Sequence, residues 1–224
     1  MKTIIAVTIF GILTYAFAEK LKYGENVCQD VDGLVNLDLK KFFKGTWYLT
    51  HSTPSARVTG STICRDYEPE VKENGTVVVS YGYYENGADG NYYDIKCYGN
   101  QNKTRIDIFN FDCYSTNTRG EDNVPHVNAS FVATDYDNFG VIYRCVESRT
   151  HFEDNVFIIF RRPDPSDGEV KKIAKFYKLK LNKLISRKGV TCKTKKKKKK
   201  KKKIGAPPAP SNFKPKKFFF GAPI

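Results

Sequence analysis

The sequence predicts an all-β domain, an antiparallel sandwich or barrel, with one α-helix near the end of the chain. Three observations lead to this fold class. Short segments rich in β-branched and aromatic residues recur up to residue 162, and turn-prone residues separate them. One later segment has the apolar period of a helix. The six cysteines behind an N-terminal export signal indicate paired cystines that hold a secreted domain together.

Seven segments have the composition of strands. In one of them Ile106 and Ile108 alternate with Arg105 and Asp107, which is the period-two pattern of a half-buried strand. Short turns between many such segments favour a sandwich or barrel. The segments are residues 61–68, 75–84, 90–99, 103–114, 126–136, 139–148 and 155–162.

One amphipathic helix is expected within residues 166–189. Ser166 and Glu169 have the spacing of a capping box, and Gly189 lies just past the expected end. Apolar residues recur at steps of three and four and form one stripe, which we expect to pack on the outside of the sheet. The stripe consists of Val170, Ile173, Ala174, Tyr177, Leu181, Leu184 and Ile185.

Residues 1–18 are predicted to be a secretory signal peptide. One lysine precedes an apolar run at residues 4–13, and the segment ends on Ala16-Phe17-Ala18, the small-residue pattern of a cleavage site. The run is too short to span a membrane. We therefore expect residues 19–194 to form one secreted domain that makes disulfides.

The charge of the chain is concentrated at its end. Of the formal net charge of +14, one unit is Lys2 and twelve are lysines after Thr194, so residues 19–194 carry only +1. The domain thus has no electrostatic footprint for nucleic acid. Residues 195–224 begin with nine lysines and continue as a Pro- and Lys-rich segment that is expected to be disordered. We interpret this tail as translated poly(A) and cloning sequence, since AAA encodes lysine.

The motifs of common enzymes and metal sites are absent. The sequence has no G-x-S-x-G, H-E-x-x-H or Gly-rich phosphate loop, so no catalytic residue is assigned. His51, His126 and His151 do not have the spacing of metal ligands. Three sequons predict glycosylation at Asn74, Asn102 and Asn128.

Three short motifs together resemble the conserved regions of the lipocalin family. Gly45-Thr46-Trp47 begins the first strand, Thr134-Asp135-Tyr136 separates two late strands, and Arg161-Arg162 ends the last strand. The resemblance implies an eight-stranded antiparallel up-and-down barrel with the C-terminal helix packed outside. It also implies that an arginine, expected to be Arg162, packs across Trp47 at the closed end.

The resemblance narrows to the salivary lipocalins of blood-feeding triatomine bugs, the group of triabin, pallidipin and the nitrophorins. The segments "FFKGTWYLTH" and "TDYDNFGVIYRC" and the signal peptide carry it. Carried over by position, the family's cystines imply the bridges Cys28–Cys145 and Cys64–Cys192. Cys97 and Cys113 remain and would staple a hairpin.

The resemblance implies a secreted salivary protein that impairs host haemostasis. The expected function is to sequester a small mediator, ADP or an eicosanoid such as thromboxane A2, and so to inhibit platelet aggregation or vasoconstriction. Two alternatives remain: a binder of the biogenic amines serotonin, noradrenaline or histamine, and a triabin-like inhibitor of the protease thrombin. We expect a monomer without a membrane partner.

No cofactor is expected. Nitrophorins hold haem through a histidine, and the matching stretch, residues 80–87, has none. A barrel with an open mouth is suited to one small ligand. Candidate ligand-binding residues are Tyr81, Tyr83, Tyr93 and Arg144.

The charge that a ligand carries is left open by the sequence. An amine would need an acid at the mouth, such as Glu85 or Asp89. An anion would need a base, such as Arg57, Arg65 or Arg144. Both kinds of residue are present.

Overall fold

The computed structural model describes residues 20–24, 27–85, 90–116, 125–147 and 152–193. The predicted signal peptide, the tail at 195–224, Asp89 and His151 lie outside the described residues.

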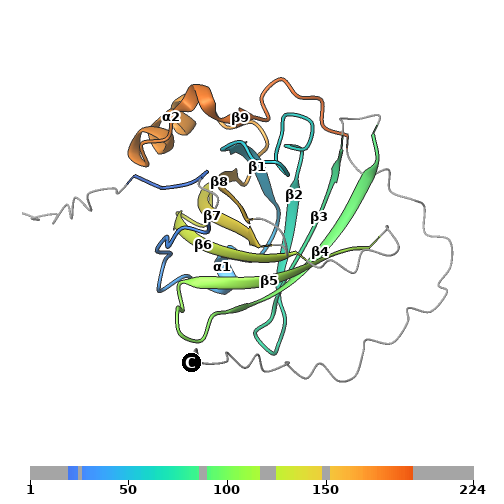
Figure 1. Cartoon of the computed structure of the whole chain (residues 1–224), viewed down its shortest axis with the longest axis vertical. Coiled ribbons are helices and arrows are strands. Elements are labelled where there is room, and N and C mark those ends of the chain that lie inside the picture. Colours follow the sequence, from blue (N-terminus) through green and yellow to red (C-terminus); the bar gives the residue numbers. More distant parts are fainter. Residues whose placement is uncertain (1–19, 25–26, 86–89, 117–124, 148–151, 194–224) are drawn as a thin grey trace, which may run out of the picture. The chain divides into compact units, whose positions relative to one another are not determined.

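Eight antiparallel strands form a closed barrel (Figure 1). Strands that follow each other in the sequence are paired, and β1 also pairs with β8, which closes the sheet. The prediction of an eight-stranded barrel is confirmed. The strands are β1 (Trp47–Ser52), β2 (Asp66–Val71), β3 (Val77–Tyr84), β4 (Tyr92–Gln101), β5 (Ile108–Ser115), β6 (His126–Thr134), β7 (Phe139–Glu147) and β8 (Phe152–Phe160).

Two predicted strands begin too early. β2 starts at Asp66 rather than at residue 61, and β5 starts at Ile108 rather than at residue 103. The alternation around Ile106 was wrong, because Ile106 is 46% exposed. The Asn102 side chain accepts hydrogen bonds from the backbone N–H groups of Thr104 and Arg105 at 2.9 and 3.0 Å. This local turn replaces strand pairing.

A short ninth strand, β9 (Ile185–Ser186), completes the edge of β1. β2 pairs only with the first two residues of β1, Trp47 and Tyr48, so the later part of that edge would otherwise be bare. β9 pairs with His51 and Ser52 instead. The Cys64–Cys192 disulfide joins the C-terminal segment to the loop before β2.

The disulfides have the pairing that the resemblance implied: Cys28–Cys145, Cys64–Cys192 and Cys97–Cys113. Cys97 and Cys113 are directly opposed on β4 and β5. The other two bridges span 117 and 128 residues of sequence. Long closed loops of this kind stabilise a domain by about 2–5 kcal/mol each.

Helix α2 (Asp167–Phe176) packs against the outside of the barrel (Figure 1). Its capping box is present as predicted, with Ser166 accepting from the Glu169 N–H and the Glu169 carboxylate accepting from the Ser166 N–H. Val170 and Ala174 are buried with Val141, Val156, Ile158 and Phe160 of the barrel wall.

The helix ends at Phe176, nine residues before Ile185, the last residue of the apolar stripe, so the expectation of one long helix was wrong. Lys178 has φ +53°, in the left-handed region. The N–H of Leu179 donates to the carbonyl of Ala174 at 2.8 Å, and that of Lys178 to Lys175 at 3.2 Å. These two bonds form a Schellman motif, which turns the chain so that Leu179 is buried. Leu181 then lies in a short 3₁₀ helix, η1 (Leu181–Lys183).

Replacing Lys178 by glycine should stabilise the domain. At φ +53° a lysine carries a steric cost of about 1–2 kcal/mol that a glycine does not. The greater conformational freedom of glycine in the unfolded chain offsets part of this gain. We expect Lys178→Gly to raise the free energy of unfolding by about 0.5–1 kcal/mol in urea titrations. Lys171→Gly, in the middle of α2, is the control and should lower it by about 1 kcal/mol. Destabilisation by Lys178→Gly would contradict the assigned backbone conformation.

Arg105 ties the N-terminal segment to the barrel. Its guanidinium bonds the carboxylates of Asp107, Asp30 and Asp32 at 2.8, 2.5 and 2.9 Å. Asp107 also accepts from the N–H of Gly33 at 3.0 Å. The hydrogen bonds from Arg105, and then the Gly33 N–H, hold the pKa of Asp107 well below its ordinary value.

Asp107 should therefore make the domain sensitive to acid. Its depressed pKa gives a contribution to stability that is complete above the unfolded pKa, near 4, and is lost as the pH falls below that value. Asp107→Asn should lower the thermal midpoint at pH 6 and flatten its decline between pH 4 and pH 2. Differential scanning calorimetry measures both effects, and a decline as steep as that of the parent chain would argue against this role.

Among the described residues, no helix is both long and apolar enough to cross a membrane.

Candidate functional site

The closed end of the barrel is built around Trp47, which is buried. Helix α1 (Leu39–Phe42) covers it from below, and the indole N–H donates to the carbonyl of Phe42 at 2.8 Å. The rings of Phe42, Phe43 and Phe131 meet edge-on at 4.9–5.2 Å between centroids. This packing of aromatic side chains forms an apolar floor.

The arginine across Trp47 is Arg161, not Arg162, so that expectation was wrong. The guanidinium carbon of Arg161 lies 3.5 Å from the indole centroid. Arg162 instead pairs with Glu169 of α2 on the outside. Alternate residues of a strand point to opposite faces, and Phe157 and Ile159 point inward. Position 161 continues the inward series, and position 162 the outward one.

The Arg161 guanidinium also donates hydrogen bonds to several backbone carbonyls at the closed end. Its Nε donates to the carbonyl of Tyr136 at 3.1 Å, and its Nη2 to that of Lys41 at 3.1 Å. Nη1 donates to the carbonyl of Lys44 at 2.5 Å. The adjacent Gly45 has φ +62°, a conformation in which other residues are strained. The first and last predicted motifs are therefore in contact.

The middle motif, Thr134-Asp135-Tyr136, forms the β6–β7 turn at the same end. The Asp135 carboxylate accepts from the backbone N–H groups of Asn138 and Phe139 at 2.8 and 2.9 Å. The Tyr136 hydroxyl accepts from the N–H of Asp38 at 3.1 Å. The three motifs thus hold the closed end together, and their role is structural.

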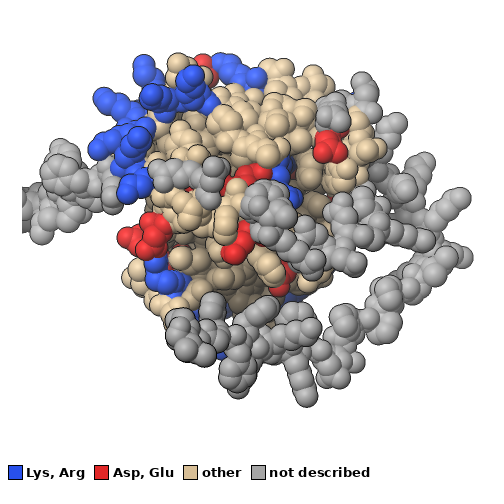
Figure 2. Space-filling model, viewed as in Figure 1, with Lys and Arg blue, Asp and Glu red and all other residues tan. Residues whose placement is uncertain are grey.

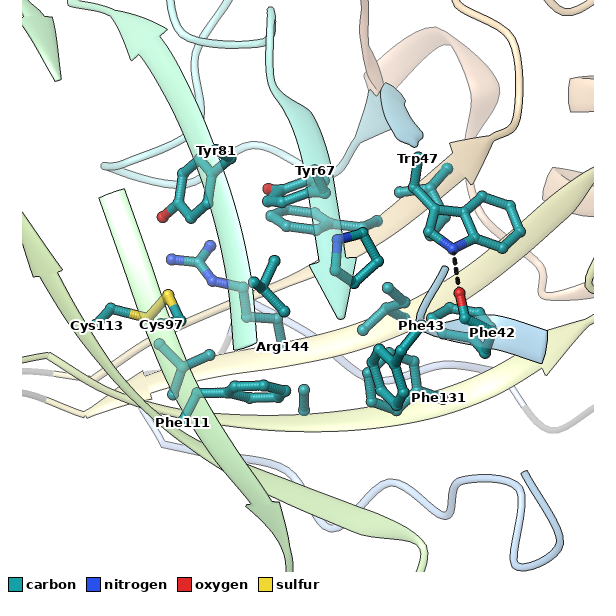
Figure 3. A pocket seen from close by; sticks show the side chains of 17 residues that line it. Phe42, Phe43, Trp47, Tyr67, Tyr81, Cys97, Phe111, Cys113, Phe131 and Arg144 are labelled. Carbon is teal, nitrogen blue, oxygen red and sulfur yellow. Dashed lines mark hydrogen bonds between the residues drawn. A yellow bond between two sulfur atoms is a disulfide. The ribbon is translucent and has the colours of Figure 1, made fainter. Parts of the chain in front are cut away.

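Above this floor lies an apolar cavity inside the barrel (Figure 3). Its volume of about 110 Å³ is several times the room that one water needs, so it can take a hydrocarbon segment. Most lining side chains are apolar. The lining consists of Phe42, Phe43, Trp47, Tyr67, Pro69, Val79, Tyr81, Cys97, Phe111, Cys113, Val127, Ala129, Phe131, Ile142, Arg144, Phe157 and Ile159.

Arg144 is the one charged side chain of this lining. Figure 3 shows its guanidinium reaching toward Tyr81 and the Cys97–Cys113 bridge, at the side of the cavity away from Trp47. Nη1 donates to Asn155 at 3.1 Å, and the guanidinium lies 5.2 Å from the Phe157 centroid. No ion pair of Arg144 occurs within the described residues. Burial, and then the charge of Arg65, lower the pKa of Arg144.

Arg65 is a second buried guanidinium beside the cavity, 2% exposed. It lies 4.6 Å from the ring centroid of Tyr83 and 5.9 Å from that of Tyr81. Its Nε and Nη2 donate to the carbonyls of Thr62 and Arg57, so it too has no carboxylate partner in the part of the chain that the structure describes. Arg65 and Arg144 therefore place two guanidinium groups without a carboxylate ion pair, within the described residues, near one apolar space, an arrangement suited to an anion.

A run of tyrosines whose rings contact one another leads outward from these arginines. Tyr67 and Tyr81 lie 4.8 Å apart, Tyr81 and Tyr83 6.3 Å, and Tyr83 and Tyr93 5.4 Å, between centroids. Burial raises the pKa of Tyr67 to about 12, so its phenol stays neutral and can donate a hydrogen bond. The Tyr93 hydroxyl donates to Glu85 at 2.9 Å, outside the cavity.

The four residues predicted to bind ligand lie at different distances from the cavity. Tyr81 and Arg144 line the cavity, Tyr83 lies against Arg65, and Tyr93 lies farther out. Tyr67 and the phenylalanines of the floor were missed. Alternate residues of β3, Val79 and Tyr81, face the cavity. The same alternation, applied to the neighbouring strands, could have identified further inward-facing residues.

The loop between β1 and β2 covers the end of the barrel opposite Trp47. Val58 and Ile63 are fully buried in the interior cluster. The buried Glu153 carboxylate accepts from the Ser55 hydroxyl at 3.0 Å and the Arg57 N–H at 3.1 Å. Glu153 and Arg65 thus both hydrogen-bond the backbone of Arg57 in this loop, Glu153 at its N–H and Arg65 at its carbonyl.

The predicted glycosylation sites differ in exposure. Asn74 is exposed in the β2–β3 turn, whereas Asn102 and Asn128 are half-buried. The Asn110 side chain lies between the latter two and hydrogen-bonds to both. Its amide oxygen accepts from the Asn102 amide at 3.3 Å, and its amide nitrogen donates to the Asn128 oxygen at 3.1 Å. Glycosylation at all three stays a prediction. No group of three metal-ligating side chains occurs in the described ranges.

Comparison with known proteins decides the family. The family model described as Triabin matches residues 18–174, more than half of the chain. The protein belongs to the triabin family. Triafestin-2 of Triatoma infestans is 35% identical over 73% of this chain and 80% of its own. Triabin of Meccus pallidipennis is 32% identical over 77% of this chain and 99% of its own.

Solved structures show the same lipocalin-like fold. The tryptamine complex of the amine-binding protein of Rhodnius prolixus has a TM-score of 0.58 at 16% identity, over 71% of this chain and 85% of that one. A variant of LTBP1 in complex with leukotriene C4 has a TM-score of 0.50 at 24% identity, over 72% of this chain and 92% of that one. This triabin-family chain is a binding protein rather than an enzyme.

Proposed function

We propose that this triabin-family protein is a secreted salivary trap for an eicosanoid, such as thromboxane A2, which it binds inside the barrel. The observation that carries the proposal is the position of Arg144, with Arg65 beside it, above a cavity that is otherwise apolar. Removal of such a mediator would inhibit platelet aggregation or vasoconstriction.

The physical chemistry of an eicosanoid matches this arrangement. Its hydrocarbon part gains about 25 cal/mol for each Å² buried against Phe42, Phe43 and Phe131. Its single carboxylate would meet guanidinium groups that burial has deprived of water. Hydrogen bonds to a charged group contribute about 1.5–3 kcal/mol. The phenols of Tyr67 and Tyr81 can donate to further oxygens.

ADP and the amines fit the site less well. ADP carries a polar ribose and adenine beside its diphosphate, whereas most of the side chains that line the cavity are apolar. An amine needs a carboxylate, and no Asp or Glu belongs to the lining. Glu153, the buried acid nearby, already accepts from Ser55 and Arg57. The solved complex of LTBP1 with leukotriene C4 supports the idea that this fold accommodates an eicosanoid.

Secretion into saliva is proposed from the predicted signal peptide, the three disulfides and the family. We further propose that the native domain ends near Thr194, just after Cys192. Intact mass of the deglycosylated native protein tests this boundary. A mass that includes residues 195–224 would overturn it.

Isothermal titration with a panel of ligands tests the function. A stable thromboxane analogue should bind with a Kd below 1 µM, whereas ADP, serotonin and noradrenaline should bind at least tenfold more weakly. Tighter binding of an amine or of ADP would replace the eicosanoid assignment. Binding of thrombin, in the absence of any small-molecule binding, would indicate the protease inhibitor instead.

A further inference from the structure

Six lysines lie within residues 171–183, which contain no acid. All six are exposed. Residues 19–194 carry a net charge of +1, so without these six lysines the rest of the domain would carry −5. The net positive charge of the domain therefore comes from this one segment. We call the six the lysine face: Lys171, Lys172, Lys175, Lys178, Lys180 and Lys183.

The fold gathers these lysines on the outside of the molecule. Val170 and Ala174 bury one side of α2 against the barrel. Lys171 and Lys175 are four residues apart on the opposite side, and Lys172 lies three residues before Lys175. Figure 2 shows blue side chains gathered over the region where Figure 1 places α2.

The positively charged side chains of the lysine face repel one another. Like charges at helix spacings of three and four destabilise a helix by a few tenths of a kcal/mol per pair. Within the described residues, none of the six lysines makes an ion pair. The first turn of α2 differs, since Asp167 pairs with Lys188 and Glu169 with Arg162. Lys178 also occupies a backbone conformation that favours glycine.

We propose that the lysine face is a docking surface for a sulfated linear polysaccharide of the heparin type. Flexible lysine ammonium groups on a nearly neutral domain are complementary to a dense row of sulfates and give an electrostatic attraction that salt weakens. Such polyanions are extracellular, as the disulfides require of this domain.

The exposed side of α2 favours this occupant over a membrane. Insertion into lipid needs an apolar helix face, and the apolar side of α2 is already used against the barrel. Only Phe176 and Leu181, 51% and 41% exposed, stand among the lysines. The surface is separate from the ligand cavity, which lies inside the barrel.

Titration of a heparin octasaccharide into the full chain tests the proposal. Residues 195–203 are changed from lysine to glutamine in every version, so that the tail does not bind the probe. The triple variant Lys171→Gln, Lys172→Gln, Lys175→Gln should bind at least tenfold more weakly at 0.15 M salt. The slope of log K against log salt should fall in magnitude by about 2–3, as for three lost anion contacts.

Two further variants make the test specific. Lys40→Gln, Lys44→Gln, Lys103→Gln changes the net charge equally at exposed sites elsewhere and should weaken binding less than twofold. Lys178→Gly should weaken binding severalfold although it stabilises the fold. Equal weakening by both triple variants, no binding by the parent, or tighter binding to duplex DNA or to phosphatidylserine vesicles would each overturn the proposal.

Discussion

Replacing Arg144 by methionine should weaken binding of a thromboxane analogue about 10- to 100-fold. The arginine is the one charged side chain of the cavity lining, and the loss of a hydrogen-bonded charge partner costs about 1.5–3 kcal/mol of binding free energy. Methionine fills similar space without charge, so apolar burial of the ligand is retained. Isothermal titration at neutral pH measures the change in Kd.

Arg162→Met is the matched control, because Arg162 lies outside the barrel and pairs with Glu169. It should leave the Kd unchanged within about twofold. Arg65→Met should weaken binding as well, and its effect should not add fully to that of Arg144→Met, since the two charges interact. Unchanged affinity in both cavity variants would exclude an anionic head group at this position.

Replacing Arg161 by methionine should destabilise the domain by about 3 kcal/mol. The change removes the cation–π contact with Trp47 and leaves carbonyls of Lys41, Lys44 and Tyr136 without their donor. A shielded cation–π contact contributes up to about 2 kcal/mol, and hydrogen bonds from a charged donor add to it. The thermal midpoint should fall by roughly 6–12 °C.

Arg162→Met again serves as the control for stability. An exposed ion pair contributes about 0–1 kcal/mol, so this variant should shift the midpoint by only a few degrees. The pair of variants decides between the two arginines that the sequence places side by side. A larger loss of stability in Arg162→Met would contradict the geometry of the closed end.

The arginine pair illustrates what the sequence can and cannot predict. The strand pattern predicted a sandwich or barrel, and the resemblance of the motifs around Trp47, Tyr136 and the end of β8 to the lipocalin regions implied the eight-stranded barrel. They did not decide between Arg161 and Arg162, because that choice depends on which face of β8 points inward. Phe157 and Ile159 determine this face, and their inward direction is visible only once β8 is paired with β1 and β7.

The end of α2 shows the same limit. The apolar period from Val170 to Ile185 predicted one long helix. The chain breaks it at Lys178, a residue with no turn preference of its own. Burial of Leu179 and pairing of Ile185 with β1 are gains of tertiary structure that outweigh the local helix period.

For the candidate site, single residues were predictable but their grouping was not. Tyr81 and Arg144 were expected from their residue types and line the cavity. The choice of an anion over an amine depends on Arg65 and Arg144 being close together while Glu85 bonds Tyr93 outside the cavity. Residues 65, 85 and 144 are separated in the sequence, so their positions relative to the cavity are known only once the barrel is closed.

The central claim is that an anionic, largely apolar ligand lies in the barrel with its carboxylate at the two arginines. A crystal structure of the protein with a bound thromboxane analogue tests this most directly. We predict carboxylate oxygens within about 3.2 Å of a guanidinium nitrogen of Arg144 or Arg65, with the hydrocarbon chain against Phe42 and Phe131. A ligand bound with its carboxylate away from both arginines, or bound outside the cavity, would contradict the account.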